Sequence, residues 1–384
     1  MRRFCSTLRI GGLGPLSPPG IPSAGRDLLD GMQLAVRQIN NAGGVGRSML
    51  DLVFEDTKGL PAAGLDAVDR LARHGVDVLA GEYHSMVANA VVAEVDRLRL
   101  PFVCASATLD AITARRLSRV FRIAPPQSYG WRAYASYLAA TGMSHVFAVM
   151  EHSIYWEAGA AVIESRLLES GIPFTRLRID SENGIVGAID GMQASIAGVP
   201  TPHMLLLLVS RLEDLRSIAH EVRNRRLNNS PSLILGDPAG RTIFHDWWDA
   251  AGADASGIPF LAYERPGRLT ARGESAARDF ETEYGREPSF VALEGYDAIV
   301  VLEAGARAAG SVDPAAVCHA LRHTEVQGTR GTIAFSTEPA GVVHQQWKWA
   351  PACVVEFRAG RRRFSSSELL WDAELSGPRP TEAG

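Results

Sequence analysis

The sequence predicts an α/β protein built from parallel sheets with helices on both faces. Apolar strand segments alternate with amphipathic helical segments through most of the chain, an order typical of parallel sheets. Segments such as 204–209 (MLLLLV) are continuously apolar, as expected of strands covered on both sheet faces. A chain of 384 residues is too long for one ordinary core, so we expect two domains.

The first fifty residues give the clearest element pattern. Residues 8–13 (LRIGGL) predict a strand, and a proline-rich loop follows it. The next segment predicts a long helix that ends at Gly43 and Gly44, because its apolar residues recur three and four apart: Leu28, Met32, Ala35, Val36 and Ile39. Residues 50–55 alternate in polarity and predict a second strand.

The later elements follow in the same alternation. We expect helices at 61–74, 86–98, 127–141, 156–170, 185–197 and 212–226. The strands between them are expected at 76–80, 101–106, 145–150, 175–179, 204–209 and 232–236. Two late helices are predicted at 289–308 and 313–323, and further strands at 258–262, 331–335, 344–350 and 353–360.

Composition excludes several classes of function. The net charge of −4 and a pI near 6.2 provide no overall positive field for nucleic acid or anionic lipid. No apolar run reaches the ~18 residues of a membrane-spanning helix, so no membrane insertion is expected. The four cysteines lack zinc or redox spacing, and no hydrolase, metalloprotease or phosphate-loop motif is present. We therefore expect no enzyme activity, no cofactor and no metal.

The start of the chain bears on localisation. Residues 1–7 (MRRFCST) run almost directly into the first strand, without the apolar stretch and cleavage site that export requires. We expect either that the protein stays in the cytoplasm, as the sequence stands, or that this start is not the true one.

The residue pattern of the N-terminal region resembles that of a known family. The start of type I periplasmic binding proteins is similar to the segment GPLSPPG…GRDLLDGMQLAVRQINNAGGVGRSMLDLVFEDTKG. Within that group, the segment most resembles the branched-chain amino acid binding family of ABC transporters. The segment 295–321 (GYDAIVVLEAGARAAGSVDPAAVCHAL) looks like the late helix pair of that family. The resemblance covers about residues 7 to 358, and the family also includes cytosolic amide sensors.

The resemblance implies a fold and a division of the chain. It implies two Rossmann-like lobes with parallel sheets, joined by a three-stranded hinge, which close on a small molecule. Lobe I would hold 7–124 and 264–336, and lobe II 125–263 and 337–363. Residues 364–384 would form a C-terminal tail.

Two loops of the first lobe are the leading candidates for a ligand site. In open parallel sheets, ligands bind beyond the carboxyl ends of the strands, and residues 81–85 and 106–110 follow two predicted strands directly. The resemblance implies that Ser85 binds an α-carboxylate. It also implies that Ser106, Ala107 and Thr108 hold the carboxylate and the α-amine. Ser85 and Thr108 could instead cap helices. Tyr83 replaces the small aliphatic residue of leucine binders.

The second lobe contributes weaker candidates. Tyr155 and Trp156 follow the strand 145–150, where an aromatic pair could stack on a ligand or simply pack the lobe interface. Asp237 lies beside the position where the family places the acid that pairs with the ligand ammonium. Its alternative role is that of a turn residue.

The function that the resemblance implies is binding, without chemistry. We expect a protein that binds an amino acid or a related compound for an ABC transporter, its partners being that solute and a permease. The alternative is a cytosolic amide-type sensor that acts on a regulatory protein. Ser85→Ala and Thr108→Ala are expected to weaken ligand binding while leaving the fold nearly intact.

Overall fold

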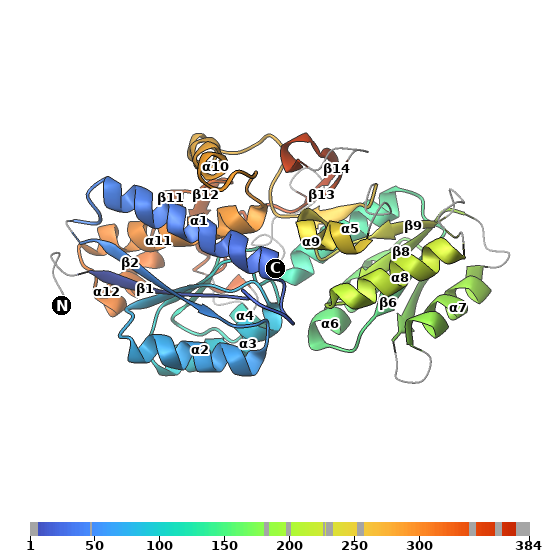
Figure 1. Ribbon diagram of the computed structural model, residues 1–384, viewed down its shortest axis with the longest axis horizontal. Coiled ribbons are helices and arrows are strands. Elements are labelled where there is room, and N and C mark those ends of the chain that lie inside the picture. The colour runs from blue at the N-terminus through green and yellow to red at the C-terminus, as the bar shows by residue number, and fades with distance from the viewer. Residues whose placement is uncertain are drawn as a thin grey trace. The chain divides into compact units, whose positions relative to one another are not determined.

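The chain folds into two compact units (Figure 1). The computed structural model describes residues 7–46, 48–179, 184–196, 201–225, 227, 233–251, 257–337, 343–357 and 363–373. Unit 1 contains the described residues of Met1–Pro126 and Arg268–Pro351. Unit 2 contains those of Gln127–Gly267 and Ala352–Ser376.

A five-stranded parallel sheet forms the centre of unit 1. Its strands β1 (Leu8–Gly14), β2 (Leu50–Asp56), β3 (Val78–Gly81), β4 (Phe102–Cys104) and β5 (Val120–Arg122) lie in the order β2-β1-β3-β4-β5. The connecting helices are α1 (Pro22–Asn41), α2 (Pro61–Arg73), α3 (Ser85–Arg97) and the short α4 (Ala111–Ala114). The carboxyl ends of β3 and β4 lie side by side in this sheet, so the loops after them are neighbours.

The late segment of unit 1 supplies the helix layer beside α1. It comprises α10 (Ala271–Tyr284), α11 (Phe290–Ala309), α12 (Pro314–Leu321) and the hairpin of β11 (Glu325–Gln327) with β12 (Thr332–Ala334). Figure 1 shows α1 and α11 on one face of the sheet and α2 with α3 on the other. Helices α1 and α11 approach closely at Gly31, where an added Cβ would lie 1.9 Å from the carbonyl oxygen of Ala292.

Unit 2 has a second parallel sheet, of four strands. These are β6 (His145–Met150), β7 (Phe174–Arg178), β8 (His203–Leu208) and β9 (Leu233–Gly236), in the order β7-β6-β8-β9. The helices of this unit are α5 (Gln127–Ala140), α6 (Ile154–Glu169), α7 (Gly184–Ile196), α8 (Leu212–Asn224) and α9 (His245–Ala251). An antiparallel sheet of β10 (Phe260–Ala262), β13 (Cys353–Glu356) and β14 (Glu368–Asp372) completes the unit.

The α/β class with parallel sheets in two lobes is confirmed. The third passage between units comes after Pro351 and not at the lobe boundary of 336–337 that the resemblance implies, because residues 345–347 bond within unit 1. There the Arg122 amide donates to the Gln345 carbonyl (3.0 Å), and the Trp347 indole donates to the Thr332 carbonyl (2.7 Å). The segment 344–350 accordingly forms isolated bridges to Arg122 and Phe335 in place of a strand.

The end of the chain also differs from its prediction as a tail. Residues 368–372 form β14, which pairs with β13, and the Asp372 carboxylate accepts hydrogen bonds from Arg265 at 2.7 and 3.0 Å. The rest of the predicted tail, 374–384, and residues 358–362 lie outside the described residues.

Candidate functional site

Ser85 connects the two loops that follow β3 and β4. Its hydroxyl oxygen accepts hydrogen bonds from the backbone N–H groups of Thr108 (3.0 Å) and Leu109 (3.2 Å). Ser85 is the first residue of α3, whose N-cap is His84, and the N-cap of α4 is Asp110. Neither Ser85 nor Thr108 therefore occupies a capping position, and Ser85 holds one loop against the other.

Glu82 shapes the first of these loops from inside the unit. Its backbone adopts a left-handed conformation (φ 66°), unusual for a residue with a side chain. Its buried carboxylate accepts hydrogen bonds from the backbone N–H groups of Tyr83 (3.0 Å) and His84 (2.7 Å). Burial raises the pKa of Glu82 to about 7, although these N–H groups and the Thr57 hydroxyl act in the opposite direction.

Tyr83 and His84 extend the site toward the loop after β1. The two rings meet edge to face with centroids 5.3 Å apart, and the Ile21 N–H donates to His84 Nε2 at 3.3 Å. Tyr83 is half-buried, so part of its ring is exposed at the carboxyl end of β3.

The second loop is fixed by a buried polar network that includes α11. The Ser106 hydroxyl donates to the carboxylate of Glu294, which also accepts from Arg330 Nη1 at 3.1 Å. Burial raises the pKa of Glu294 to about 7, with Arg330 and Ser106 opposing the rise and Asp297 adding to it. The loop therefore has an acidic group directly behind Ser106.

In unit 2, Trp156 is part of the core. The residue is 3% exposed, its indole N–H donates to Glu151 (2.8 Å) and Ser210 (3.1 Å), and the Arg241 guanidinium lies 5.1 Å from the ring centroid. Tyr155 meets the Trp131 ring edge to face, with centroids 5.8 Å apart, and remains half-buried. Of this pair, Tyr155 is the residue with surface left to contact a ligand.

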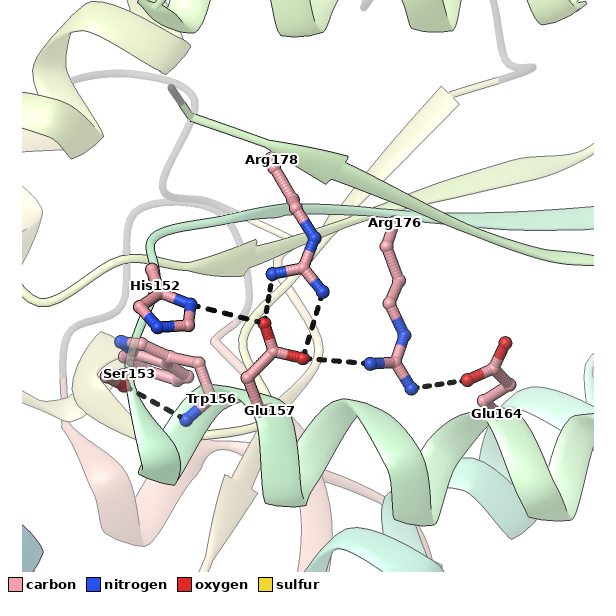
Figure 2. A network of polar contacts seen from close by, with 7 residues as sticks. All are labelled: His152, Ser153, Trp156, Glu157, Glu164, Arg176 and Arg178. Carbon is pink, nitrogen blue, oxygen red and sulfur yellow. Dashed lines mark hydrogen bonds and ion pairs between the residues drawn. The ribbon is translucent and has the colours of Figure 1, made fainter. Parts of the chain in front are cut away.

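An ion-pair network holds the start of α6 against the edge strand β7 (Figure 2). Glu157 accepts from Arg176 (2.9 Å) and from Arg178, and Arg176 also reaches Glu164. The hydrogen bond from Arg178 holds the pKa of Glu157 below its usual value. Ser153 caps α6 by accepting from the Trp156 N–H at 3.2 Å. The backbone at Tyr155 and Trp156 is thereby fixed at the end of β6.

Asp237 is engaged in its own turn. One carboxylate oxygen accepts from the Thr242 N–H (2.8 Å) and hydroxyl (2.9 Å), and the other accepts from the Ala239 N–H (3.1 Å). The side chain is fully buried, with Arg241 3.6 Å away. This geometry gives Asp237 the turn role that the sequence left open, because both oxygens already have donors.

Sequence reasoning did not find Glu82, Glu294 or Arg122, although the last two carried a signal. Glu294 stands in a helical run that is otherwise apolar (FVALEGYDAIVV), and Arg122 stands in an apolar strand (VFRIA). A charged residue at such a position is buried only with polar partners, so it marks an internal network.

The described residues lack two kinds of feature. No group of three or more histidine, cysteine, aspartate or glutamate side chains is placed to hold a metal ion there. Over the same part of the chain, no helix combines the length and apolar character that a membrane crossing needs.

Comparison with known proteins identifies the family. The model of a family described as periplasmic binding protein matches residues 7–351. The Leu/Ile/Val-binding protein BraC3 of Rhizobium johnstonii is 26% identical over 370 residues, covering 91% of this chain and 93% of that protein.

Two solved structures share the fold at low identity. The leucine binding protein LivK of Thermotoga maritima has a TM-score of 0.78 at 19% identity, covering 94% of this chain and 97% of that one. A solute binding protein of R. palustris, solved in complex with benzoate, has a TM-score of 0.76 at 21% identity, covering 97% of each chain. The chain therefore belongs to the type I periplasmic binding proteins, a family of solute-binding proteins.

Proposed function

We propose that this solute-binding protein binds an α-amino acid for an ABC transporter. The observation that carries the proposal is that two hydroxyl groups on adjacent loops of unit 1 form hydrogen bonds in opposite directions, one as acceptor and the other as donor. Ser85 accepts two backbone N–H groups, whereas Ser106 donates to a carboxylate.

The contacts of Ser85 suit it to a carboxylate. A serine hydroxyl has one proton and two lone pairs. Because the Thr108 and Leu109 N–H groups occupy the lone pairs, the Ser85 proton is the group left for a ligand. Neutral donors of this kind stabilise an anion and leave no buried charge unpaired when it departs.

The contacts of Ser106 suit it to an ammonium group. Its proton is directed to Glu294, so its oxygen is the side that can accept from a ligand. Above pH ~7, where Glu294 is ionised, its negative charge adds a favourable field for a cation, partly offset by Arg330. A ligand with a carboxylate and an ammonium a few ångströms apart matches both hydroxyls, and a simple carboxylic acid matches only Ser85.

Comparison with relatives supports the ligand class. BraC3 is named as a Leu/Ile/Val-binding protein and LivK as a leucine binding protein, whereas the R. palustris protein was solved with benzoate. Glu294 behind Ser106 favours the amino acids over the aromatic acid. The half-buried Tyr83 beside the carboxylate position favours a side chain that tolerates an aromatic neighbour. The relatives compared are transport proteins, which gives the sensor alternative no support.

The test is a thermal-shift screen followed by calorimetry. The panel contains the twenty amino acids, their deaminated and carboxamide analogues, short amides, ureas and benzoate. We expect an α-amino acid at ~100 times its Kd to raise Tm by roughly 5 °C, and its deaminated analogue to give little shift. In Ser106→Ala, the preference for the amino acid over that analogue should fall.

Two outcomes would contradict the proposal. A shift with benzoate and with no amino acid would retain solute binding and exclude the zwitterion assignment. No shift with any amino acid or carboxylate would overturn the proposal as a whole.

A further inference from the structure

Arg122 lies directly behind the loop that follows β4. Its side chain is fully buried at the end of β5. Nη1 donates to the carbonyl oxygens of Thr108 (2.9 Å) and Leu109 (2.8 Å). A buried guanidinium thus contacts the two residues whose N–H groups bond to Ser85.

One of these contacts acts through a single peptide group. The carbonyl of Thr108 and the N–H of Leu109 belong to the same amide. Arg122 donates to the oxygen of that amide at 2.9 Å, and the N–H of the same amide donates to the Ser85 hydroxyl at 3.2 Å. A cation at the carbonyl end of an amide draws electron density toward the oxygen and makes the N–H a stronger donor.

The same polarisation continues to the hydroxyl. When the Ser85 oxygen accepts stronger N–H donors, its own O–H becomes a stronger donor in turn. The chain of groups is therefore the Arg122 guanidinium, the 108–109 amide, the Ser85 hydroxyl and then the ligand.

We propose that Arg122 is a positioning residue that transmits its positive charge through the 108–109 peptide and the Ser85 hydroxyl, and so gives the site its preference for a carboxylate over an uncharged carboxamide. The inference rests on the proposed function, because it requires a carboxylate at Ser85. Arg122 itself does not touch the ligand.

Other contacts hold the guanidinium at the angle that this relay needs. Nε donates to Gln346 Oε1 at 2.6 Å, and Nη2 donates to the Thr113 hydroxyl at 2.9 Å. Gln346 is itself fixed by donating to the Ala124 carbonyl at 2.7 Å. The planar fork therefore has a neutral oxygen acceptor on each of its three nitrogens, and Nη1 stays directed at the loop.

The experiment measures a ratio of affinities in each variant. The probe pair is the amino acid that stabilises the protein most in the panel and its own carboxamide, for example L-leucine and L-leucinamide. The ratio of the two Kd values does not depend on the fraction of protein that is folded, because that fraction weakens both affinities equally. A variant that merely loosens the structure therefore leaves the ratio unchanged.

Two variants remove the charge in different ways. Arg122→Met removes the charge and the donors, and Arg122→Gln keeps a neutral donor in the same place. In both, we expect the preference for the carboxylate to fall by about tenfold. If Arg122→Met does not fold, Arg122→Gln carries the test.

Arg265→Met is the matched control. Arg265 is a partly buried arginine that pairs with Asp372 within unit 2, so its loss removes a charge and an ion pair from the other unit. The stability of the Arg265→Met variant should fall, and its ratio of carboxamide to amino acid Kd should stay within about twofold of that of the unmodified protein.

A double substitution distinguishes transmission through the Ser85 hydroxyl from a direct electrostatic effect of Arg122 on the ligand. In a Ser85→Ala background the last donor of the chain is absent, so adding Arg122→Gln should alter the ratio little. An unchanged ratio in Arg122→Gln would overturn the inference, as would a tenfold fall that persists without Ser85. Either result leaves the proposed function standing if the amino acid still binds, whereas failure of every carboxylate to bind the unmodified protein would overturn both.

Discussion

Ser85 has a structural role besides the binding role proposed for it. Its hydroxyl is the acceptor for two N–H groups in the buried loop after β4. Truncation therefore leaves two donors without an acceptor, which in buried positions costs about 1–3 kcal/mol. The sequence-based expectation that Ser85→Ala leaves the fold nearly intact neglected these bonds, which no sequence pattern shows.

We accordingly expect Ser85→Ala to lower both the free energy of unfolding, by ~1–3 kcal/mol, and the affinity for the amino acid, by tenfold or more. Urea unfolding and calorimetry measure the two effects. Thr270→Ala serves as the control, because Thr270 caps α10 by accepting from the Gly273 N–H and takes no part in the loops. It should lose ~1 kcal/mol of stability and keep its affinity. Unchanged stability in Ser85→Ala would show that the two loops are held together by other contacts.

At the scale of secondary-structure elements, the contact between α1 and α11 determines where Glu294 lies. The backbones of the two helices approach closely enough at Gly31 that only hydrogen fits against the Ala292 carbonyl. Ala292 and Glu294 are two residues apart on α11, so a displacement of this helix also displaces the carboxylate behind Ser106.

Gly31→Ala is therefore expected to destabilise the protein by roughly 2 kcal/mol or more and to weaken amino acid binding, since the added methyl group forces the helices apart. Gly191→Ala is the matched control. It is also a substitution within a helix, but its added Cβ would have no neighbour closer than 3.9 Å. It should stabilise by up to ~1 kcal/mol through helix propensity alone. Equal effects of the two substitutions on Tm would contradict the close contact.

At the scale of the whole molecule, two buried carboxyl groups make stability depend on pH. Burial raises the pKa values of Glu82 and Glu294 from 4.5 to about 7. Between these values the folded protein holds protons that the unfolded chain has released. The contribution is fully present below pH ~4.5 and is lost as pH rises through ~7.

Glu82→Gln removes one of these groups. Without ligand, its free energy of unfolding relative to the unmodified protein should increase between pH 5 and pH 8, on the order of 2 kcal/mol. Urea unfolding at both pH values measures the change. Glu94→Gln should show no such increase. It removes a carboxylate that pairs with Arg97, and this pairing holds the pKa of Glu94 below its usual value. A difference that stays constant with pH would contradict the raised pKa of Glu82.

The parts of the structure that sequence could predict are those with a local cause. The helix spacing from Leu28 to Ile39 and the continuously apolar strand 204–209 predicted α1 and β8. Residues 81–85 and 106–110 were recognisable as site candidates because each follows a predicted strand directly, and the structure shows that these strands are adjacent.

What sequence could not predict depends on partners far away along the chain. Ser106 and Glu294 are 188 residues apart, and Gln346 and Arg122 are 224 apart. No local periodicity reports such pairs. For the same reason, the sequence did not show that residues 345–347 belong with β5 or that residues 368–372 complete a sheet.

The discontinuity of unit 1 also has a consequence for biosynthesis. Helix α11 is largely buried in that unit, but the ribosome must make all of Gln127–Gly267 before it begins the segment that contains α11. At ~5–20 residues per second this interval lasts on the order of ten seconds. During that time the sheet face that α11 later covers has no such cover, whereas most of unit 2 has already emerged. We therefore expect nascent unit 1 to be the part of the chain that chaperones protect.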